Sequence, residues 1–357
     1  MIDPHVHLRD WNQSHKETLL HGLSVACRAG LDGVFEMPNM DPSLTSRETI
    51  LRRIDEADRA ISRLGLPFFH GLYAGLTPDP RQVEQVIRAH EELFPRVVGL
   101  KMFAGHSTGN MGIVEQEDQR RLYRLLAALG YKGVLAVHCE KEGLLRPAEW
   151  DPREPSSHGR ARPPEAEVES ISDQLHLARA EGFRGRLHIV HVSVPAALDL
   201  ISDAKRDGVL VTCALTPHHA LLSAEMMDGP DGVFLKTNPP LRPGRMPAAM
   251  LEGLFDGRID WIETDHAPHS REEKGGGAAA SRGGAAASAS FASGIPVLPF
   301  YPRFVRLLTD RGMPRERVEK ITHEAICRTF GISVPRNGRA PAYDLSSEYE
   351  IDPFERL

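Results

Sequence analysis

The sequence has no long apolar segment. No run approaches the roughly 18 consecutive apolar residues that a membrane-spanning helix needs, and the N-terminal residues do not follow the pattern of a signal peptide. Clusters of lysine and arginine that would bind nucleic acid are also missing, and the formal net charge of −6 is modest for 357 residues. These absences argue against a membrane protein and against a nucleic-acid-binding protein.

Cysteine is scarce as well. The chain has four cysteines, which lie far apart and form no Cys-x-x-Cys pair. Isolated cysteines of this kind are typical of free thiols in a reducing compartment. The sequence therefore indicates a cytoplasmic protein without disulfide bonds.

Short apolar runs rich in β-branched residues alternate along the chain with longer, helix-like patterns. The predicted strands cover residues 2–6, 33–37, 68–73, 97–102, 134–138, 187–191, 209–214 and 261–263. The length alone is compatible with two ordinary domains or with one barrel of about 250 to 400 residues. Eight strands separated by helices favour the second interpretation and predict an α/β fold, a (β/α)8 TIM barrel.

The predicted helices have apolar residues three and four positions apart. They cover residues 46–64, 117–129, 165–180 and 196–207. The first is expected to begin with a capping box, formed by Thr45 and by Glu48 three residues later.

The catalytic barrel is expected to occupy residues 1–334, with a last helical stretch over residues 314–330. Residues 335–357 have an irregular pattern and are expected to form a tail that packs on the barrel. Residues 275–290 consist almost entirely of glycine, alanine and serine, which is the composition of a flexible linker. Because this loop follows the last strand, it is either an active-site loop or a surface loop without a role.

Polar side chains of the metal-binding type occur at the C-terminal ends of the predicted strands, where such barrels carry their active sites. His5 and His7 lie two residues apart on one strand and therefore point to the same side. Imidazole nitrogens are favoured ligands of zinc and similar metals. The candidate metal ligands are His5, His7, Lys101, His138, His191 and Asp265.

Four imidazoles and one carboxylate exceed what one tetrahedral zinc ion needs, and they suit two ions about 4 Å apart. Such a pair needs a bridging ligand, for which Lys101 is the candidate. A lysine buried on an apolar strand readily loses its charge, and its neutral amine can react with CO₂ to give a carbamate that contacts both metals. The alternative is a lysine that reaches solvent from the strand end or pairs with an acid.

Each ligand also has a structural interpretation. Taken singly, His138 and His191 could be buried histidines with satisfied hydrogen bonds, and Asp265 could be a helix N-cap. His188 lies outside the alternation that would point His191 inward, so it is expected to be structural. The concentration of all the candidates at strand ends favours the metal site.

Arg9 follows the two N-terminal histidines. Its guanidinium offers a planar set of donors that suits a carboxylate, although it could instead pair with Asp10 or another acid. An arginine beside a metal site indicates an enzyme for a small acidic substrate.

Five motifs together resemble the dihydroorotase family of the metal-dependent amidohydrolase superfamily. They are residues 3–10, residues 37–39, Lys101 after Gly99-Leu100, residues 238–242 and residues 264–269. The resemblance extends from residue 1 to about residue 300. It implies a TIM barrel with two Zn²⁺ ions per chain, held by the six candidate ligands, with Lys101 N6-carboxylated. It further implies a substrate-binding set of Arg9, Asn39, Asn238 and His269.

Members of this family interconvert L-dihydroorotate and N-carbamoyl-L-aspartate in de novo pyrimidine biosynthesis. The resemblance implies that the zinc ions activate a water for attack on the ring carbonyl. Asp265 would act as general base and then as general acid toward the ring nitrogen. Arg9, Asn39 and His269 would hold the exocyclic carboxylate and so position the ring. Asn39 also has a simpler structural interpretation, since the dipeptide Pro-Asn is favoured in turns.

The chain departs from the family pattern in places. It starts at the first strand, so the expected barrel lacks the small N-terminal β-sandwich segment of many dihydroorotases. Trp11-Asn12 stands where Pro-Gly is often found, and residues 275–290 replace a more ordinary loop. Pro217-His218-His219 also resembles the family, but its chemistry indicates no role beyond a structural one.

The sequence is also compatible with two other functions. One is another cyclic-amide hydrolase, of the allantoinase or hydantoinase type, against which Arg9 argues. The other is a catalytically inactive dihydroorotase-like scaffold, although no expected metal ligand is missing. The expected partners are a small-molecule substrate, a second copy of the chain in a homodimer, and an association with aspartate transcarbamoylase that the sequence leaves undecided.

Overall fold

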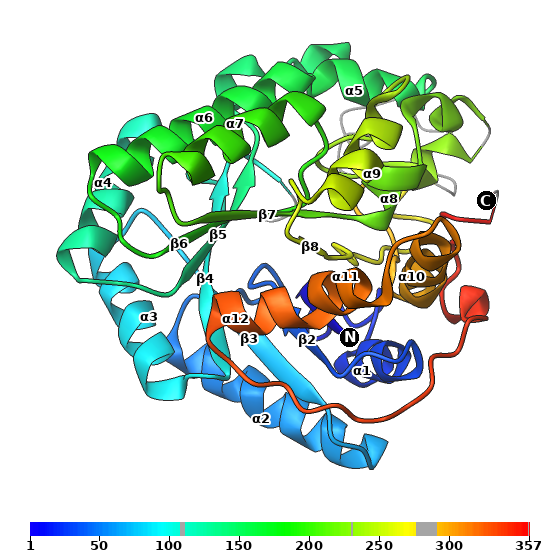
Figure 1. Cartoon of the computed structure of the whole chain (residues 1–357), viewed down its shortest axis with the longest axis horizontal. Coiled ribbons are helices and arrows are strands. Elements are labelled where there is room, and N and C mark those ends of the chain that lie inside the picture. The colour runs from blue at the N-terminus through cyan, green and yellow to red at the C-terminus, as the bar shows by residue number, and fades with distance from the viewer. Residues whose placement is uncertain (108–110, 230, 276–290, 356) are drawn as a thin grey trace.

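The computed structural model describes residues 1–107, 111–229, 231–275, 291–355 and 357. Eight parallel strands form one sheet in the order β1 to β8, and the helices lie around its outside (Figure 1). The residues after β8 complete the barrel, because Val6 and His266 form a parallel bridge and the His7 N–H donates to the His266 carbonyl at 2.8 Å. The predicted TIM barrel is confirmed.

The strands agree with the predicted ones to within a few residues at each end. They are β1 (Ile2–Val6), β2 (Gly33–Glu36), β3 (Phe69–Gly75), β4 (Val97–Ala104), β5 (Val134–Cys139), β6 (Arg186–Ile189), β7 (Val211–Leu215) and β8 (Trp261–Ile262).

Helices connect consecutive strands and continue beyond the barrel. The α-helices are α1 (Leu19–Arg28), α2 (Arg47–Leu64), α3 (Pro80–Leu93), α4 (Gln116–Ala128), α5 (His158–Ala161), α6 (Pro164–Ala180), α7 (Pro195–Arg206), α8 (Pro217–Leu221), α9 (Met246–Asp256), α10 (Tyr301–Asp310), α11 (Arg315–Glu319) and α12 (Ala325–Phe330). The short 3₁₀ turns are η1 (Glu142–Leu144), η2 (Pro147–Glu149), η3 (Pro155–Ser157), η4 (Ala224–Asp228), η5 (Gly232–Leu235), η7 (Leu298–Phe300) and η9 (Ser346–Glu348). The helix predicted over residues 314–330 is interrupted by a π-turn, η8 (Lys320–Glu324), between α11 and α12.

Helix α2 begins one residue later than the predicted capping box requires. Its N-cap is Ser46, whose side chain accepts from the Thr49 N–H, while the Thr49 hydroxyl accepts from the Ser46 N–H. The predicted pair of Thr45 and Glu48 is therefore wrong. With Ser46 as the cap, Glu48 is the second helical residue, whereas the capping box uses the third.

Apolar side chains fill the barrel beneath the polar strand ends. They form a core separate from the larger one between sheet and helices. Its residues on the strands or directly after them are Ile2, Phe35, Met37, Tyr73, Val98, Val134, Ala136, Val190, Ala214 and Trp261. Phe330 of α12 packs on this core, with its ring centroid 5.0 Å from that of Phe35 and 6.1 Å from that of Trp261. The other end of the barrel, at the C-terminal ends of the strands, is left for polar residues.

The C-terminal segment runs along the barrel after α12 (Figure 1). The Asn337 N–H donates to Asp32 at 2.8 Å, and Phe354 stacks on Phe300 with ring centroids 3.9 Å apart. All four cysteines are described and are free thiols, and no helix among the described residues is long and apolar enough to cross a membrane. The predicted glycine, alanine and serine loop falls, apart from Gly275, outside the described residues.

Candidate metal centre and active site

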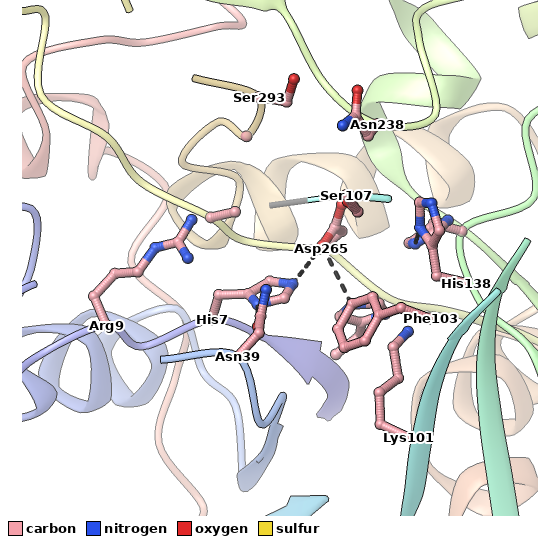
Figure 2. A pocket seen from close by; sticks show the side chains of 14 residues that line it. His7, Arg9, Asn39, Lys101, Phe103, Ser107, His138, Asn238, Asp265 and Ser293 are labelled. Atoms are coloured by element: carbon pink, nitrogen blue, oxygen red, sulfur yellow. Dashed lines mark hydrogen bonds and ion pairs between the residues drawn. The ribbon is translucent and has the colours of Figure 1, made fainter. Parts of the chain in front are cut away.

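A cavity opens at the C-terminal end of the barrel (Figure 2). All six candidate metal ligands line this cavity, although they come from five different strands or the residues that follow them. The other residues that line it are Arg9, Asn39, Phe103, Ser107, Asn238, Ala267, Ser293 and Gly294. The structure thus brings together side chains whose common location was predicted from strand ends alone.

His5, His7 and Asp265 form a compact group. Asp265 Oδ1 lies 3.2 Å from His5 Nε2 and 3.0 Å from His7 Nε2. The imidazole rings of the two histidines have centroids 5.3 Å apart, as expected for side chains on the same face of one strand. Asp265 has a left-handed backbone with φ of +50°, and the chain after it is not helical, so its interpretation as an N-cap is wrong.

The other ring nitrogen of each histidine is held by an acceptor. His5 Nδ1 donates to Glu263 Oε1 at 3.1 Å, and His7 Nδ1 donates to the amide oxygen of Asn39 at 2.6 Å. With the proton on Nδ1, each ring would keep a lone pair on Nε2 for a metal ion, and both Nε2 atoms face Asp265. Burial lowers the pKa of His7 to about 4, which favours the neutral form that a metal ligand needs.

His138 and His191 form a second pair across the cavity. His138 Nδ1 lies 3.1 Å from His191 Nε2, while His138 Nε2 donates to Glu140 Oε2 at 3.0 Å. Two imidazole nitrogens on one tetrahedral zinc ion, each about 2.0 to 2.1 Å from it, would stand about 3.3 Å apart. The observed separation is therefore close to what a shared ion requires.

His191 reaches the cavity through an unusual backbone. Strand β6 ends at Ile189, and His191 is left-handed with φ of +38°, a conformation that costs energy in residues other than glycine. The expectation that the strand continues to His191 is wrong. The Glu263 carboxylate stabilises this turn, since its Oε1 accepts from the His191 main-chain N–H at 2.6 Å.

His188 points into the barrel, contrary to the alternation assumed from the sequence. Its Nε2 donates to Glu263 Oε2 at 3.2 Å, and its ring lies 4.5 Å from that of Trp261 between centroids. His188 thus occupies the inward face of β6, and the left-handed turn after the strand brings His191 to the same side. The expected structural role of His188 agrees with these contacts.

Lys101 extends from β4 toward the same cavity. Its side chain is fully buried, and within the described part of the chain its Nζ has no hydrogen-bond partner. Burial lowers the pKa of Lys101 to about 8, although the carboxylates of Glu263 and Asp265 act in the opposite direction. A substantial fraction of this amine is therefore neutral near physiological pH.

Asp265 is held in its ionised form. Burial would raise its pKa, but the neighbouring His5, together with His7 and His191, keeps the pKa well below the ordinary value of an aspartate. The donor set thus comprises an ionised carboxylate, four imidazoles and a buried lysine whose Nζ has no hydrogen-bond partner among the described residues. These residues fit divalent metal ions of the zinc type.

Arg9 lines the cavity beside this group and does not pair with Asp10. Its Nη2 donates to His269 Nε2 at 3.0 Å, and its Nε donates to the Pro268 carbonyl at 3.3 Å. Asp10 instead accepts from the main-chain N–H groups of Trp11 and Leu19, both at 2.8 Å. The guanidinium is therefore held in place without a carboxylate in direct contact with it among the described residues.

The other predicted substrate residues occupy different positions. Asn238 lines the cavity, and Asn39 does so while holding His7. His269 is buried in contact with Arg9 and is not among the residues that line the cavity. Its Nδ1 donates to Glu273 Oε2 at 3.2 Å, so this histidine connects the guanidinium to an acid.

Two carboxylates at the site were missed by the sequence interpretation. Glu263 orients His5 and the His191 backbone, and Glu140 orients His138 while Arg162 binds it through several hydrogen bonds. Both have the same signal in the sequence, since each lies two residues from a ligand and thus on the same side of an extended chain. His-x-Glu at residues 138–140 and Glu-x-Asp at residues 263–265 could have indicated them.

No protein-family model matches the chain. A dihydroorotase from Brevibacillus brevis is 37% identical over 281 residues, which cover 77% of this chain and 61% of that relative. A dihydroorotase from Bacillus cereus is 31% identical, with 99% of this chain and 78% of that relative covered. The chain thus spans less than two thirds of the first relative and more than three quarters of the second.

Solved structures with the same fold include an L-hydantoinase (dihydropyrimidinase) from Arthrobacter aurescens. Its TM-score is 0.78 at 23% identity, with 94% of this chain and 73% of that chain covered. A D-hydantoinase (dihydropyrimidinase) from Thermus sp. has a TM-score of 0.73 at 21% identity, with the same coverage. The motifs, the barrel and the sequence identity over nearly the whole chain agree, and the chain belongs to the dihydroorotase family of cyclic-amide hydrolases in the amidohydrolase superfamily.

Proposed function

We propose that the protein is a dihydroorotase, which reversibly hydrolyses L-dihydroorotate to N-carbamoyl-L-aspartate. The observation that carries this proposal is a buried guanidinium, that of Arg9, in the wall of a cavity lined by a metal-type ligand set. A cyclic amide bearing a carboxylate would satisfy both features at once. The relatives at 31% and 37% identity are themselves named dihydroorotases, which supports the same substrate.

His5, His7, His138, His191 and Asp265 would hold two divalent ions, for which we propose zinc. Such ions, when bound, lower the pKa of a water to about 7 in the best case and polarise a substrate carbonyl. The chain contributes the orientation of these ligands. Glu263, Asn39 and Glu140 fix the rings so that each presents one lone pair to the cavity.

Lys101 would supply the bridging ligand as a carbamate. Its neutral amine adds to the carbon of CO₂, a C–N bond forms, and the released proton goes to solvent, which leaves a carboxylate on the lysine. The burial of Lys101 and the lack of a hydrogen-bond partner for its Nζ among the described residues support this modification. The amine, which lies 4.9 Å from the centroid of the Phe103 ring, would otherwise remain a buried polar group without a hydrogen-bond partner among the described residues.

Asp265 would move the proton of the hydrolytic step. As an ionised carboxylate it accepts a proton from the attacking water and then gives it to the ring nitrogen as the C–N bond breaks. Its position beside both His5 and His7 fits a group that must act next to the reacting carbonyl.

Arg9 would bind the exocyclic carboxylate of the substrate. A guanidinium can form two parallel hydrogen bonds with a carboxylate, which fixes the orientation of the ring as well as its position. His269 would contribute mainly by holding Arg9, since it accepts a hydrogen bond from the guanidinium and is not among the residues that line the cavity. Asn39 and Asn238 remain proposed contacts of the substrate at the cavity wall.

The main alternative is a hydantoinase-type enzyme, which the fold of the structural neighbours allows. Hydantoin and dihydrouracil carry no carboxylate, so neither ring would form an ion pair with a buried guanidinium in the cavity wall. Arg9 therefore favours the acidic substrate.

The deciding experiment is an assay of the zinc-loaded protein with L-dihydroorotate, hydantoin, dihydrouracil and allantoin in parallel. We expect N-carbamoyl-L-aspartate to form from L-dihydroorotate, with kcat/KM about 10- to 100-fold above that for any neutral ring, since loss of a charge-assisted contact costs about 1.5 to 3 kcal/mol. A preference for a neutral ring would replace the proposal with the hydantoinase alternative. Zinc binding without turnover of any of these rings would favour an inactive scaffold.

A further inference from the structure

His158 is a buried residue to which the proposed chemistry gives no role. It lies on α5, in the connection between β5 and α6, and its side chain reaches the segment that carries Asn238. His158 Nε2 lies 3.0 Å from the main-chain carbonyl oxygen of Thr237 and 2.9 Å from the side-chain oxygen of Asn238.

These two contacts determine which ring nitrogen of His158 carries the proton. A main-chain carbonyl can only accept, so Nε2 must be the donor toward Thr237. The same N–H then faces Asn238, and the atom of the Asn238 amide that approaches it must be the oxygen. Burial and the nearby cations Lys236 and Arg162 keep the pKa of His158 well below its ordinary value, which agrees with a neutral ring carrying one proton.

The orientation of the Asn238 amide follows from this hydrogen bond. With its oxygen directed at His158, the amide NH₂ group is directed to the other side. Asn238 is also one of the residues that line the cavity. Figure 2 shows its amide oxygen turned away from Asp265 and its nitrogen on the nearer side.

His158 is itself held by packing. The indole of Trp150 contacts its ring edge-on, with centroids 5.3 Å apart, and Lys236 Nζ lies 5.2 Å from the centroid of that indole. Lys236 in turn donates to the Phe291 carbonyl and to the Ser293 hydroxyl, both at 2.8 Å. The wall that carries Asn238 is thus connected to the wall that carries Ser293.

We propose that His158 is a positioning residue that fixes the Asn238 amide with its N–H donors toward the substrate. The Asn238 amide then offers an N–H donor to a carbonyl or carboxylate oxygen of the bound ring. The flipped amide would direct its own oxygen at the substrate oxygen, and the hydrogen bond from His158 excludes that orientation. The inference rests on the proposed function in the choice of ring and in the contact of Asn238 with the substrate. The role of His158 is to act through Asn238, and it does not contact the substrate.

The test is a double-mutant cycle between the two residues. His158→Phe removes the donor, and we expect it to raise KM for L-dihydroorotate about tenfold, the cost of about one hydrogen bond, with zinc content unchanged. His158→Gln keeps an N–H donor and should restore most of the affinity. In the Asn238→Ala background, His158→Phe should change KM by less than about twofold because the amide it orients is gone.

Three outcomes would overturn the inference. They are an unchanged KM in His158→Phe, an equal loss in His158→Gln and His158→Phe, and a full additional loss in the Asn238→Ala background. The matched control is His176→Gln on the exposed face of α6, which should leave KM as it is.

A readout independent of turnover keeps this inference separate from the proposed function. In the zinc-loaded protein labelled with ¹⁵N-histidine, the NMR signals that disappear in His158→Gln should belong to a ring protonated on Nε2 only. A ring protonated on Nδ1 would overturn the inference even in an active enzyme. If the wild type hydrolyses another ring instead of L-dihydroorotate, the proposed function fails, and the same cycle is measured with that ring.

Discussion

Asp265 contacts both His5 and His7 through one oxygen, so it serves as a metal ligand and as the proposed proton carrier. Asp265→Asn keeps the shape of the side chain and removes the charge. We expect kcat to fall by about 100- to 10,000-fold, the range for loss of a general acid–base group. Steady-state kinetics with zinc analysis by atomic absorption measures this. Retained turnover at normal zinc content would remove Asp265 from the proton transfer.

Arg9 differs from a surface arginine because it is buried without a carboxylate in direct contact among the described residues. We expect Arg9→Met to raise KM for L-dihydroorotate by about 10- to 100-fold, since a charge-assisted contact contributes about 1.5 to 3 kcal/mol. Arg9→Lys keeps the charge and loses the planar set of donors, so its KM should be intermediate. The carboxylate anchor would be contradicted if KM stayed the same in Arg9→Met.

Lys101 is expected to act only in its modified form. Lys101→Ala should lower both the zinc content and kcat, and added acetate or propionate should restore part of the activity by taking the place of the carbamate. Intact-mass measurement of the wild type should show an addition of about 44 Da, the mass of CO₂, which is lost on acidification. Full activity of Lys101→Ala without any added acid would show that the bridging carbamate is not needed.

Among the elements, α2 shows how much depends on a single cap. Ser46→Ala removes the side chain that accepts from the Thr49 N–H, and we expect the free energy of unfolding to fall by about 1 kcal/mol. Thr45→Ala, at the position expected from the sequence, should change it by less than about 0.5 kcal/mol. Denaturant titration of both variants compares the two assignments, and a larger effect at Thr45 would contradict the observed cap.

The strands and their polar ends could be predicted because both follow from local patterns. Alternation along β1 places His5 and His7 together, and the chemistry of a barrel places ligands at its C-terminal end. The turn at His191 could not be predicted in this way. It depends on Glu263, which is 72 residues away in sequence, and the orientation of His5 depends on the same residue at a separation of 258.

The substrate wall shows the same limit. Asn238 was identified from a motif, but the direction of its amide is set by His158, 80 residues earlier in the chain. His158 has no distinctive pattern around it that would connect it to Asn238. Contacts between distant segments depend on the packing of the whole barrel, and a local sequence pattern does not predict that packing.

For the molecule as a whole, buried histidines make stability depend on pH. Burial lowers the pKa of His90 on α3 to about 4, against an ordinary value of 6.5. Between these two values the unfolded chain binds the proton and the folded chain does not, so the free energy of unfolding falls as the pH falls from 6.5 to 4, by about 3 kcal/mol for this group.

The measurement is denaturant unfolding of the wild type and of His90→Phe at several pH values. The difference between the two proteins should shift in favour of His90→Phe as the solution becomes more acidic. His176→Gln, at an exposed position, should follow the wild type throughout. A constant difference between pH 7 and pH 4 would contradict the low pKa of His90.

The pairing of Val6 with His266 joins the first strand of the barrel to the residues that follow the last one. During translation, β1 leaves the ribosome before β8 and has no neighbour on that edge until some 260 further residues have been made. His5 and His7 are synthesised about 260 residues before their partner Asp265. We therefore expect the nascent chain to acquire its metal site only after Asp265 has been made, so that binding of the metal marks completion of the barrel.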